Sequence, residues 1–276
     1  MLEYESWQAA LLGLLQGATE FLPISSSAHL LLMPWLLGWQ PLGLTFDVLV
    51  HGGTLAAVVI YFIKEWKYLS RQSLKGLIDQ STEQARLLSA LVIGTLPAVL
   101  VGWVFEGVIV TYLRRPSVFP TVVVVTLSGF GLVLWWADQR ASQNRNLSSM
   151  GVREGLLVGM AQALALVPGV SRSGVTISAA LLLGISRADA ARFSFLLGTP
   201  LLVITTARSL YHLLQAGSGA KYPLLPLVVG VVFSSASGYL CIRYFLKFLQ
   251  TRTYRPFVVY RLVLAAFILL LLVLGF

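Results

Sequence analysis

The chain has 276 residues, of which 57% are hydrophobic and only 11% are charged, and its mean hydropathy is +0.81. Soluble domains of this length are not normally so apolar, so the composition excludes a soluble globular protein and indicates a polytopic membrane protein. The formal charge is +9, but the basic residues lie mainly between hydrophobic runs and not in a patch with exposed aromatics. This distribution argues against a nucleic-acid partner.

The first apolar run starts near Trp7, directly after the acidic residues Glu3 and Glu5. It therefore lacks the basic leader and the small-residue cleavage site of a signal peptide, and we expect the N-terminus to be mature. The run extends from about 7 to 37 and is broken by Pro, Ser and Gly, which is typical of a segment that enters the membrane and turns back. It carries a polar motif, Gln16-Gly-Ala-Thr-Glu-Phe-Leu-Pro-Ile-Ser-Ser-Ser-Ala-His29.

This motif sets an acid, three serine hydroxyls and an imidazole inside apolar sequence. Glu20 could serve as a general base or as a metal ligand, and Gln16 lies four residues earlier on the same helical face, where it could share a ligand or merely pack. The serines 25 to 27 follow a proline, so one of them is expected to cap the returning helix. Three serines are more than capping requires. A helix N-terminus also offers free backbone amides to an anion. His29 could activate a hydroxyl or protonate a leaving oxygen.

Six further apolar runs are each close to the ~20 residues that a bilayer requires. The first contains Asp47 and His51, which are four residues apart, so a simple helical pair explains them as well as catalysis does and we place them behind the site. The single cysteine, Cys241, excludes an intrachain disulfide and is expected to pack between helices. The runs lie near 45–63, 89–106, 119–137, 193–213, 224–246 and 256–275.

A second broken apolar stretch, about 152 to 185, carries the motif Pro168-Gly-Val-Ser-Arg-Ser-Gly174. An arginine within the membrane costs at least ~2.5 kcal/mol unless a partner compensates it, and its planar fork suits phosphate oxygens. Arg172 is thus a candidate anion ligand, although an ion pair with Glu20 or Asp47 would also satisfy its charge. The flanking glycines could present amides to an anion or could simply break the helix. Together the two motifs resemble a split phosphate site.

An internal repeat links the two halves of the chain. The segment 16–23 matches 162–168 with one gap, 46–54 resembles 193–199, and 120–123 resembles 256–259. Each half then contains one re-entrant hairpin and three spans, and an odd number of spans inverts the second half relative to the first. The sequence predicts an all-α polytopic membrane protein with a single membrane domain, 1–276, built from inverted-topology repeats at about 7–137 and about 152–275. The two hairpins would approach each other from opposite faces.

The basic residues between the runs predict the orientation. Three of them fall on the face that carries the N-terminus, whereas fourteen fall on the opposite face, so the positive-inside rule makes the opposite face cytoplasmic and both termini external. The three are Arg114, Arg115 and Lys221, and the fourteen are Lys64, Lys67, Arg71, Lys75, Arg86, Arg140, Arg145, Arg153, Arg187, Arg192, Arg243, Lys247, Arg252 and Arg255; Arg172, Arg208 and Arg261 lie within runs or at their margins and are left out.

The two motifs resemble the signatures of the BacA-type undecaprenyl-diphosphatases, and the similarity extends to Phe46-Asp-Val-Leu-Val-His-Gly-Gly-Thr54 and Arg192-Phe-Ser-Phe-Leu-Leu-Gly-Thr-Pro200. The resemblance implies a bacterial inner-membrane phosphatase that removes the terminal phosphate of undecaprenyl diphosphate. We expect its site to face the outer side of the membrane. It also implies recycling of the carrier for cell-wall synthesis, bacitracin resistance and the use of Mg²⁺ or Ca²⁺. The family accepts Glu or Gln first in its acidic motif, and Gln16 here leaves Glu20 as the only carboxylate.

Carried onto this sequence, the resemblance implies Ser26 as the nucleophile or hydroxyl ligand, His29 as its acid/base partner, Glu20 as the base or metal ligand and Arg172 as the phosphate clamp. Gln16 is the second candidate metal ligand. The polar and glycine residues around these four are expected to contact the substrate: Gln16, Ser25, Ser27, Gly169, Ser171, Ser173 and Gly174. A homo-oligomer stays open.

A transporter or flippase of a polyprenyl phosphate lipid is the alternative function. Inverted repeats with broken helices at mid-membrane also occur in carriers, and the same anion site could hold a lipid phosphate during translocation. The cluster of serine, histidine and glutamate exceeds what anion binding alone requires, which favours an enzyme. A structural scaffold would leave the cost of burying Arg172 unexplained.

Overall fold

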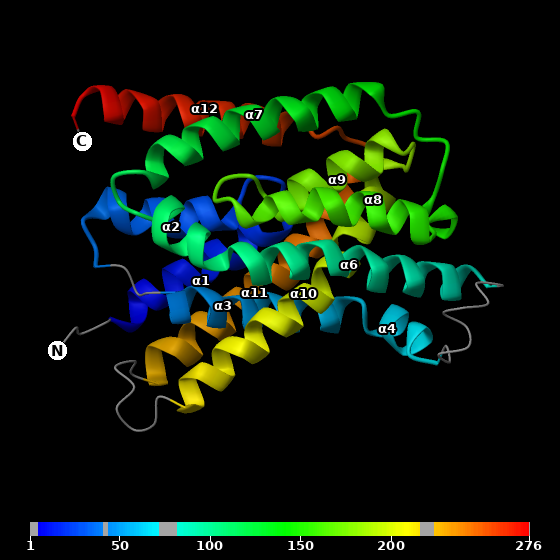
Figure 1. Cartoon of the computed structure of the whole chain (residues 1–276), viewed down its shortest axis with the longest axis horizontal. Coiled ribbons are helices and arrows are strands. Elements are labelled where there is room, and N and C mark those ends of the chain that lie inside the picture. The colour runs from blue at the N-terminus through cyan, green and yellow to red at the C-terminus, as the bar shows by residue number, and fades with distance from the viewer. Residues whose placement is uncertain (1–4, 41–43, 72–81, 216–223, 276) are drawn as a thin grey trace.

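A computed structural model describes residues 5–40, 44–71, 82–215 and 224–275. The regular secondary structure of these residues is helical, with one isolated bridge between Arg145 and Ile185. Most helices run roughly along the long axis of the molecule, and the beginning of the first helix lies at the same end as the end of the last (Figure 1). The alignment of the long helices is the arrangement expected for a bundle that crosses a bilayer.

The helices follow the apolar runs closely. In the first half they are α1 (Ser6–Phe21), α2 (Ser26–Leu37), α3 (Leu44–Tyr61), α4 (Ile63–Leu69), α6 (Glu83–Val108), the π-helical turn η1 (Ile109–Leu113) and α7 (Phe119–Arg140). In the second half they are the 3₁₀ turn η2 (Leu147–Ser149), α8 (Val152–Ala163), the 3₁₀ turn η3 (Leu164–Leu166), α9 (Arg172–Leu182), α10 (Arg187–Gln215), α11 (Leu224–Leu249) and α12 (Arg255–Val273).

Five of the six predicted spans are confirmed as helices long and apolar enough to cross a membrane, namely α6, α7, α10, α11 and α12. The predicted span at 45–63 forms α3, which bends by 76° into α4, so it makes a sixth span only if the bent pair is counted as one. Two starts were predicted too late, because α6 begins at Glu83 and α10 at Arg187. The protein is therefore a multi-pass, all-helical membrane protein.

The two broken stretches form paired helices joined by short turns. Helices α2, α8 and α9 have 12, 12 and 11 residues, which is too short to span the ~20-residue thickness of a bilayer. Lipid cannot hydrogen-bond the free backbone groups of such turns, so they must lie within the protein. Both turns are indeed buried, since Ser25 and Ser171 are 1% and 4% exposed.

Small residues bring each hairpin close to a long helix of the other half. In α1, a Cβ atom at Gly13 would lie 2.3 Å from the Gly230 carbonyl oxygen of α11. In α8, a Cβ atom at Gly159 would lie 2.2 Å from the Gly94 carbonyl oxygen of α6. Backbones that approach this closely stabilise helix pairs in a membrane through packing, because lipid supplies no hydrophobic drive for association. These two pairs make the largest helix contacts in the fold, α1 with α11 and α6 with α8.

Apart from α4, which has no counterpart in the second half, the described helices follow the same order in both halves: a short pair, a long helix, then two more. Packing follows the same order, because α1 lies on α11 just as α8 lies on α6, and α3 lies on α10. The division into two inverted repeats stays a prediction, as does the topology. Three residues on which the charge count or the termini depend, Glu3, Lys75 and Lys221, lie outside the described residues.

Candidate functional site

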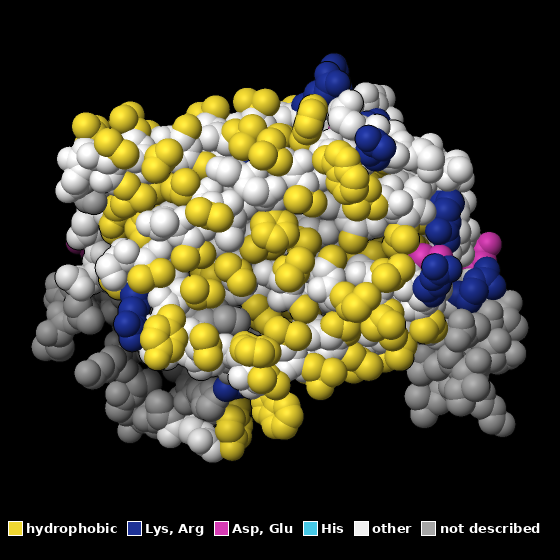
Figure 2. Space-filling model, turned by 45° about the horizontal axis from the view of Figure 1, so that its top comes forward, with side chains coloured by type: hydrophobic (Ala, Val, Ile, Leu, Met, Phe, Trp, Pro, Cys, Tyr) yellow, Lys and Arg dark blue, Asp and Glu magenta, His cyan; other side chains and the backbone are white. Residues whose placement is uncertain are grey.

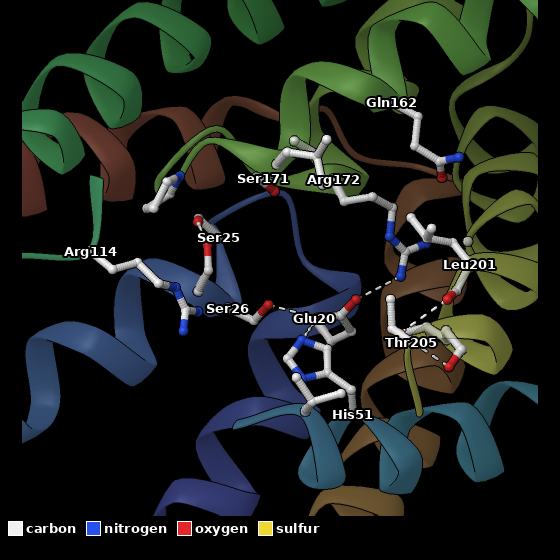
Figure 3. Close-up of a pocket in the computed structure, with 17 residues that line it drawn as sticks. Glu20, Ser25, Ser26, His51, Arg114, Gln162, Ser171, Arg172, Leu201 and Thr205 are labelled. Carbon is white, nitrogen blue, oxygen red and sulfur yellow. Dashed lines mark hydrogen bonds and ion pairs between the residues drawn. The ribbon is translucent and has the colours of Figure 1, made fainter. Parts of the chain in front are cut away.

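The turns of the two hairpins meet at one cavity of about 260 Å³, shown in Figure 3. Ser25, Ser26 and Ser27 line it from the first turn, and Ser171 and Arg172 line it from the second. The sequence placed these residues in separate motifs, and the fold brings them together. The described part of the chain thus contains one polar site to which both motifs contribute.

Each turn ends in a serine that caps the following helix in the same way. Ser25 and Ser171 have φ values of 74° and 72°, and their hydroxyls accept hydrogen bonds from the backbone amides of Ala28 and Gly174. Positive φ is uncommon and strained for serine, and such strain persists where a site requires it. The N-termini of α2 and α9 therefore face one cavity, and their free amides and dipoles favour an anion there.

Glu20 lies at the centre of the polar contacts. Its Oε2 accepts a hydrogen bond from the Ser26 hydroxyl at 2.6 Å and one from the Gln16 side-chain amide at 3.0 Å. Its Oε1 accepts a bond from Arg172 Nη2 at 2.7 Å. The carboxylate is only 6% exposed. A buried carboxylate in contact with a serine hydroxyl is the arrangement in which a base can take the proton of a nucleophile.

The guanidinium of Arg172 reaches Glu20 by passing directly over Gly198 of α10. Its second terminal nitrogen, Nη1, donates to the Ser194 carbonyl at 3.0 Å. A Cβ atom at Gly198 would lie 1.6 Å from Nη1, so only glycine leaves room for the guanidinium. Gly198 lies in the predicted span 193–213 and in the repeat segment 193–199, but no sequence signal gave it this role. The alternative interpretation of Arg172, an ion pair with Glu20, is what the structure shows.

Arg261 fixes the two turns relative to each other. Its side chain is fully buried in α12. The guanidinium donates to five backbone carbonyls, those of Pro23, Thr126, Leu127, Gly169 and Val170. Pro23 belongs to the first turn, and Gly169 and Val170 to the second. The carbonyls of the two turns thereby gain a donor inside the membrane, and the planar fork of arginine suits this task.

His29 was expected beside Ser26 as its acid/base partner, but its ring contacts other groups. Nδ1 contacts the Ser25 carbonyl at 2.7 Å, and Nε2 contacts the Tyr260 hydroxyl at 2.6 Å. The ring also stacks on Tyr260 with 5.7 Å between centroids. With both nitrogens engaged in this way, His29 is not among the residues that line the cavity. It holds the serine turn from behind, because the cap residue and the imidazole lie one helical turn apart.

Four other predicted contact residues also lie behind the cavity wall. Gln16 is fully buried beside Glu20, and Ser173 donates to the Leu22 carbonyl at 2.9 Å and so ties the second turn to the first. Gly169 has φ +88° and packs where a Cβ atom would lie 2.0 Å from the Thr126 hydroxyl. Gly174 supplies the amide that Ser171 caps. These residues shape the site, whereas the sequence analysis assigned them to the substrate.

The structure adds four polar residues to the cavity wall that the sequence motifs did not place there, namely His51, Arg114, Gln162 and Thr205. His51 of α3 lies with Nε2 3.6 Å from Glu20 Oε2. Arg114 reaches the cavity after η1 and pairs with Asp47 at 3.3 Å, although it was counted only as a topology charge. Gln162 lies beside Arg172 in Figure 3. It is the repeat counterpart of Gln16, so the internal repeat was the signal that could have identified it.

The oxygens around Glu20 fit a divalent cation that arrives with a phosphate ligand. Among the described residues, no three His, Cys, Asp or Glu side chains form a metal cluster. Mg²⁺ is commonly bound by only one or two carboxylates together with substrate phosphates. Glu20 and Ser26 offer such oxygens, and the buried Oε1 of Gln16 has no hydrogen-bond partner within the described part of the protein.

The fold and the site define a multi-pass helical membrane protein in which two paired-helix turns build a polar cavity. Residues 9–267 match the family described as "Bacitracin resistance protein BacA". The chain belongs to the BacA family. It is 47% identical to "Undecaprenyl-diphosphatase 2" of Stutzerimonas stutzeri (strain A1501), over 96% of this chain and 97% of the relative.

Two further relatives have similar sequence identity and coverage. "Undecaprenyl-diphosphatase" of Chromohalobacter salexigens is 47% identical over 94% of this chain and 96% of its own. "Undecaprenyl-diphosphatase" of Saccharophagus degradans (strain 2-40) is 45% identical over 94% of this chain and 95% of its own. The resemblance inferred from the two motifs is therefore confirmed over nearly the whole chain.

Proposed function

We propose that this protein is a membrane phosphatase that hydrolyses undecaprenyl diphosphate to undecaprenyl phosphate and inorganic phosphate. Relatives named undecaprenyl-diphosphatase match nearly the full length of the chain. The single observation that carries the proposal is the contact network of Ser26, Glu20 and Arg172 at the junction of two helix N-termini. By this reaction the protein would recycle the lipid carrier for cell-wall synthesis and confer bacitracin resistance.

The geometry suggests the order of the chemical steps. Glu20 takes the proton of the Ser26 hydroxyl while the oxygen attacks the distal phosphorus. The bond from that phosphorus to the bridging oxygen breaks, and the electron pair leaves with the lipid phosphate. Water then hydrolyses the phosphoserine and releases inorganic phosphate. Arg172 and the amides at the two helix N-termini stabilise the charge on the transferred group.

Two further residues favour an anionic ligand with several oxygens. Gln162 is 1% exposed, and neither polar atom of its amide has a hydrogen-bond partner among the described residues. A buried polar group without a partner costs about 1–3 kcal/mol, and phosphate oxygens or their bound water would remove that cost. Arg114 adds a second positive charge, on the side of Glu20 away from Leu201 and Thr205 in Figure 3. A diphosphate would contact both arginines.

The proposed cofactor is Mg²⁺ or Ca²⁺, held by the oxygens of Glu20 and Ser26 together with the substrate. The ion would neutralise charge on the phosphoryl group. Phosphate release should stop in excess chelator and return with added cation. Glu20→Gln should lower the maximal rate, because the proton acceptor is lost, and should also raise the cation concentration needed for half of the remaining activity. Full activity of the wild type in chelator would contradict a cation requirement.

The protein is proposed to lie in the bacterial inner membrane with both termini and the cavity on the outer side. Figure 2 shows basic side chains gathered toward one end of the molecule, beyond an apolar surface. The positive-inside rule would make that end cytoplasmic. A cysteine placed at the exposed Lys67 should resist an impermeant thiol reagent in intact cells, with Cys241 replaced by alanine. Rapid labelling from outside would contradict the orientation.

The decisive test of function is phosphate release from farnesyl diphosphate by the purified protein in detergent. A phosphatase releases phosphate with repeated turnover, whereas a transporter or flippase binds the lipid and releases none. The Arg172→Ala variant is the matched control, since it keeps both turns but removes the charge. Equal release by the variant would point to a contaminating phosphatase.

A further inference from the structure

A second cavity of about 480 Å³ lies between α6 and α10. Its lining is mostly apolar, with Val99, Gly102 and Trp103 from α6 and Leu201 and Ile204 from α10. Its polar members are Thr205 and Arg208 of α10. The two helices are packed side by side (Figure 1). A pocket of this size can hold a large part of a small ligand.

This groove adjoins the polar cavity and shares part of its wall. Leu166, Leu201 and Thr205 line both spaces. Arg172 lies on the same side of Glu20 as Leu201 and Thr205, whereas Arg114 lies on the other side (Figure 3). A ligand could therefore place charged groups in the polar cavity and an apolar tail in the groove, and it would pass the Leu166, Leu201 and Thr205 side chains that line both.

The groove also opens toward lipid. Trp103 is 81% exposed and Ile204 is 46% exposed, and neighbouring side chains of α6, such as Leu100 at 58%, are exposed as well. In a membrane-spanning helix such side chains face the hydrocarbon. The tail of a lipid is already in an apolar medium, so its transfer from the bilayer into the groove contributes little binding free energy. The effect of the groove is to let the head enter the protein while the tail stays out of water.

We infer that the groove between α6 and α10 is the binding site for the first isoprene units of a polyprenyl diphosphate. This inference rests on the proposed function. The proximal phosphate then lies near Arg172 and Gln162, and the distal phosphate lies toward Ser26 and Arg114. The long remainder of the chain runs from the groove into the bilayer.

Gly102 offers a direct way to obstruct the junction. A Cβ atom there would make ordinary contacts with Leu166, at 3.7 Å, so a larger side chain can be accommodated but would fill the passage between groove and cavity. Gly107 lies on the same helix, and a Cβ atom there would meet nothing within 4 Å. Gly107→Leu is therefore the matched control for Gly102→Leu.

The experiment compares a substrate that has a chain with an inhibitor that has none. We expect Gly102→Leu to raise KM for farnesyl diphosphate at least tenfold and to leave the inhibition constant of inorganic pyrophosphate within twofold. Gly107→Leu should change neither constant. Equal changes in both constants, or no change in KM, would overturn the groove assignment. Absence of turnover in the wild type would instead overturn the proposed function.

A second measurement needs neither turnover nor a folded variant. A farnesyl diphosphate analogue with a photoreactive group at the end of its first isoprene unit should label the wild type at residues 98–103 and 201–205. Excess inorganic pyrophosphate should suppress this labelling by competing for the polar cavity. Labelling confined to other helices would overturn the inference.

Discussion

The guanidinium of Arg172 and the carboxylate of Glu20 form an ion pair at 2.7 Å, although 152 residues separate them in the chain. Both side chains are nearly buried, at 11% and 6% exposed, so each is the main compensation for the charge of the other. A phosphate that enters the cavity must share Arg172 with Glu20. The pair therefore keeps the arginine in position before substrate arrives, while Glu20 remains in contact with Ser26.

Replacing Arg172 by lysine should lower kcat for phosphate release about 100-fold, because a point charge cannot reproduce the planar fork that contacts Glu20, Ser194 and phosphate together. The measurement is steady-state release from farnesyl diphosphate. Arg115→Lys, at an exposed arginine stacked on Tyr112, is the control and should be close to wild type. Near-normal turnover of Arg172→Lys would refute the clamp.

Replacing Gly198 by alanine should displace the guanidinium of Arg172, because the new methyl would lie 1.6 Å from Nη1. We expect a loss of at least tenfold in kcat, although alanine favours a helix by about 1 kcal/mol. Gly129→Ala is the control, since nothing lies within 4 Å of its Cβ position.

A double-mutant cycle separates this effect from general disruption of α10. In the Arg172→Ala background, Gly198→Ala should cost nothing further, because the group that it displaces is already absent. An additional loss of the same size in that background would show that the substitution acts elsewhere.

Replacing Ser26 by alanine should abolish turnover while substrate still binds. The measurement is single-turnover phosphate release, which isolates the chemical step. Ser27→Ala is the control, since Ser27 lines the same cavity but its hydroxyl contacts that of Ser25. A rate for Ser26→Ala within about tenfold of wild type, only ~1.4 kcal/mol, would rule out attack by this serine. Water activated by Glu20 would then be the nucleophile.

The two histidines should affect the protein through different contacts. His51→Asn removes an imidazole 3.6 Å from Glu20, so it should lower kcat and leave the free energy of unfolding close to that of wild type. His29→Asn removes contacts to the serine turn and Tyr260, so it should lower the free energy of unfolding as well as kcat. A loss of kcat in His29→Asn at wild-type stability would restore His29 as the acid/base partner.

Replacing Arg261 by methionine should destabilise the fold by about 3 kcal/mol or more, because five buried carbonyls lose their donor. The measurement is denaturant unfolding in detergent micelles. Arg252→Met, at an exposed position, is the control and should lie within about 0.5 kcal/mol of wild type. Equal stability of the two variants would mean that Arg261 does not hold the turns together.

Composition and the lengths of the apolar runs were sufficient for the class of fold. Runs of about 20 apolar residues gave five spans, and prolines and serines within shorter runs marked both hairpins, because the bilayer imposes length and backbone satisfaction on any sequence. The motifs likewise identified Glu20, Ser26 and Arg172, since ionisable groups at membrane depth are costly without a function. The 76° bend after Tyr61 carried no comparable signal.

Only the tertiary structure decided which residues face the cavity. His29 and His51 are each one helical turn from a polar neighbour in sequence, yet the packing of Tyr260 turns the first away while α3 directs the second toward Glu20. Arg114 reads as a loop charge, and Gly198 reads as one more small residue of a span. The sequence by itself determined the membrane-spanning helices and the polar motifs, because these follow from the bilayer and from local chemistry. Which side chains line the cavity depends on contacts between distant helices, and so on how the two halves of the chain pack together.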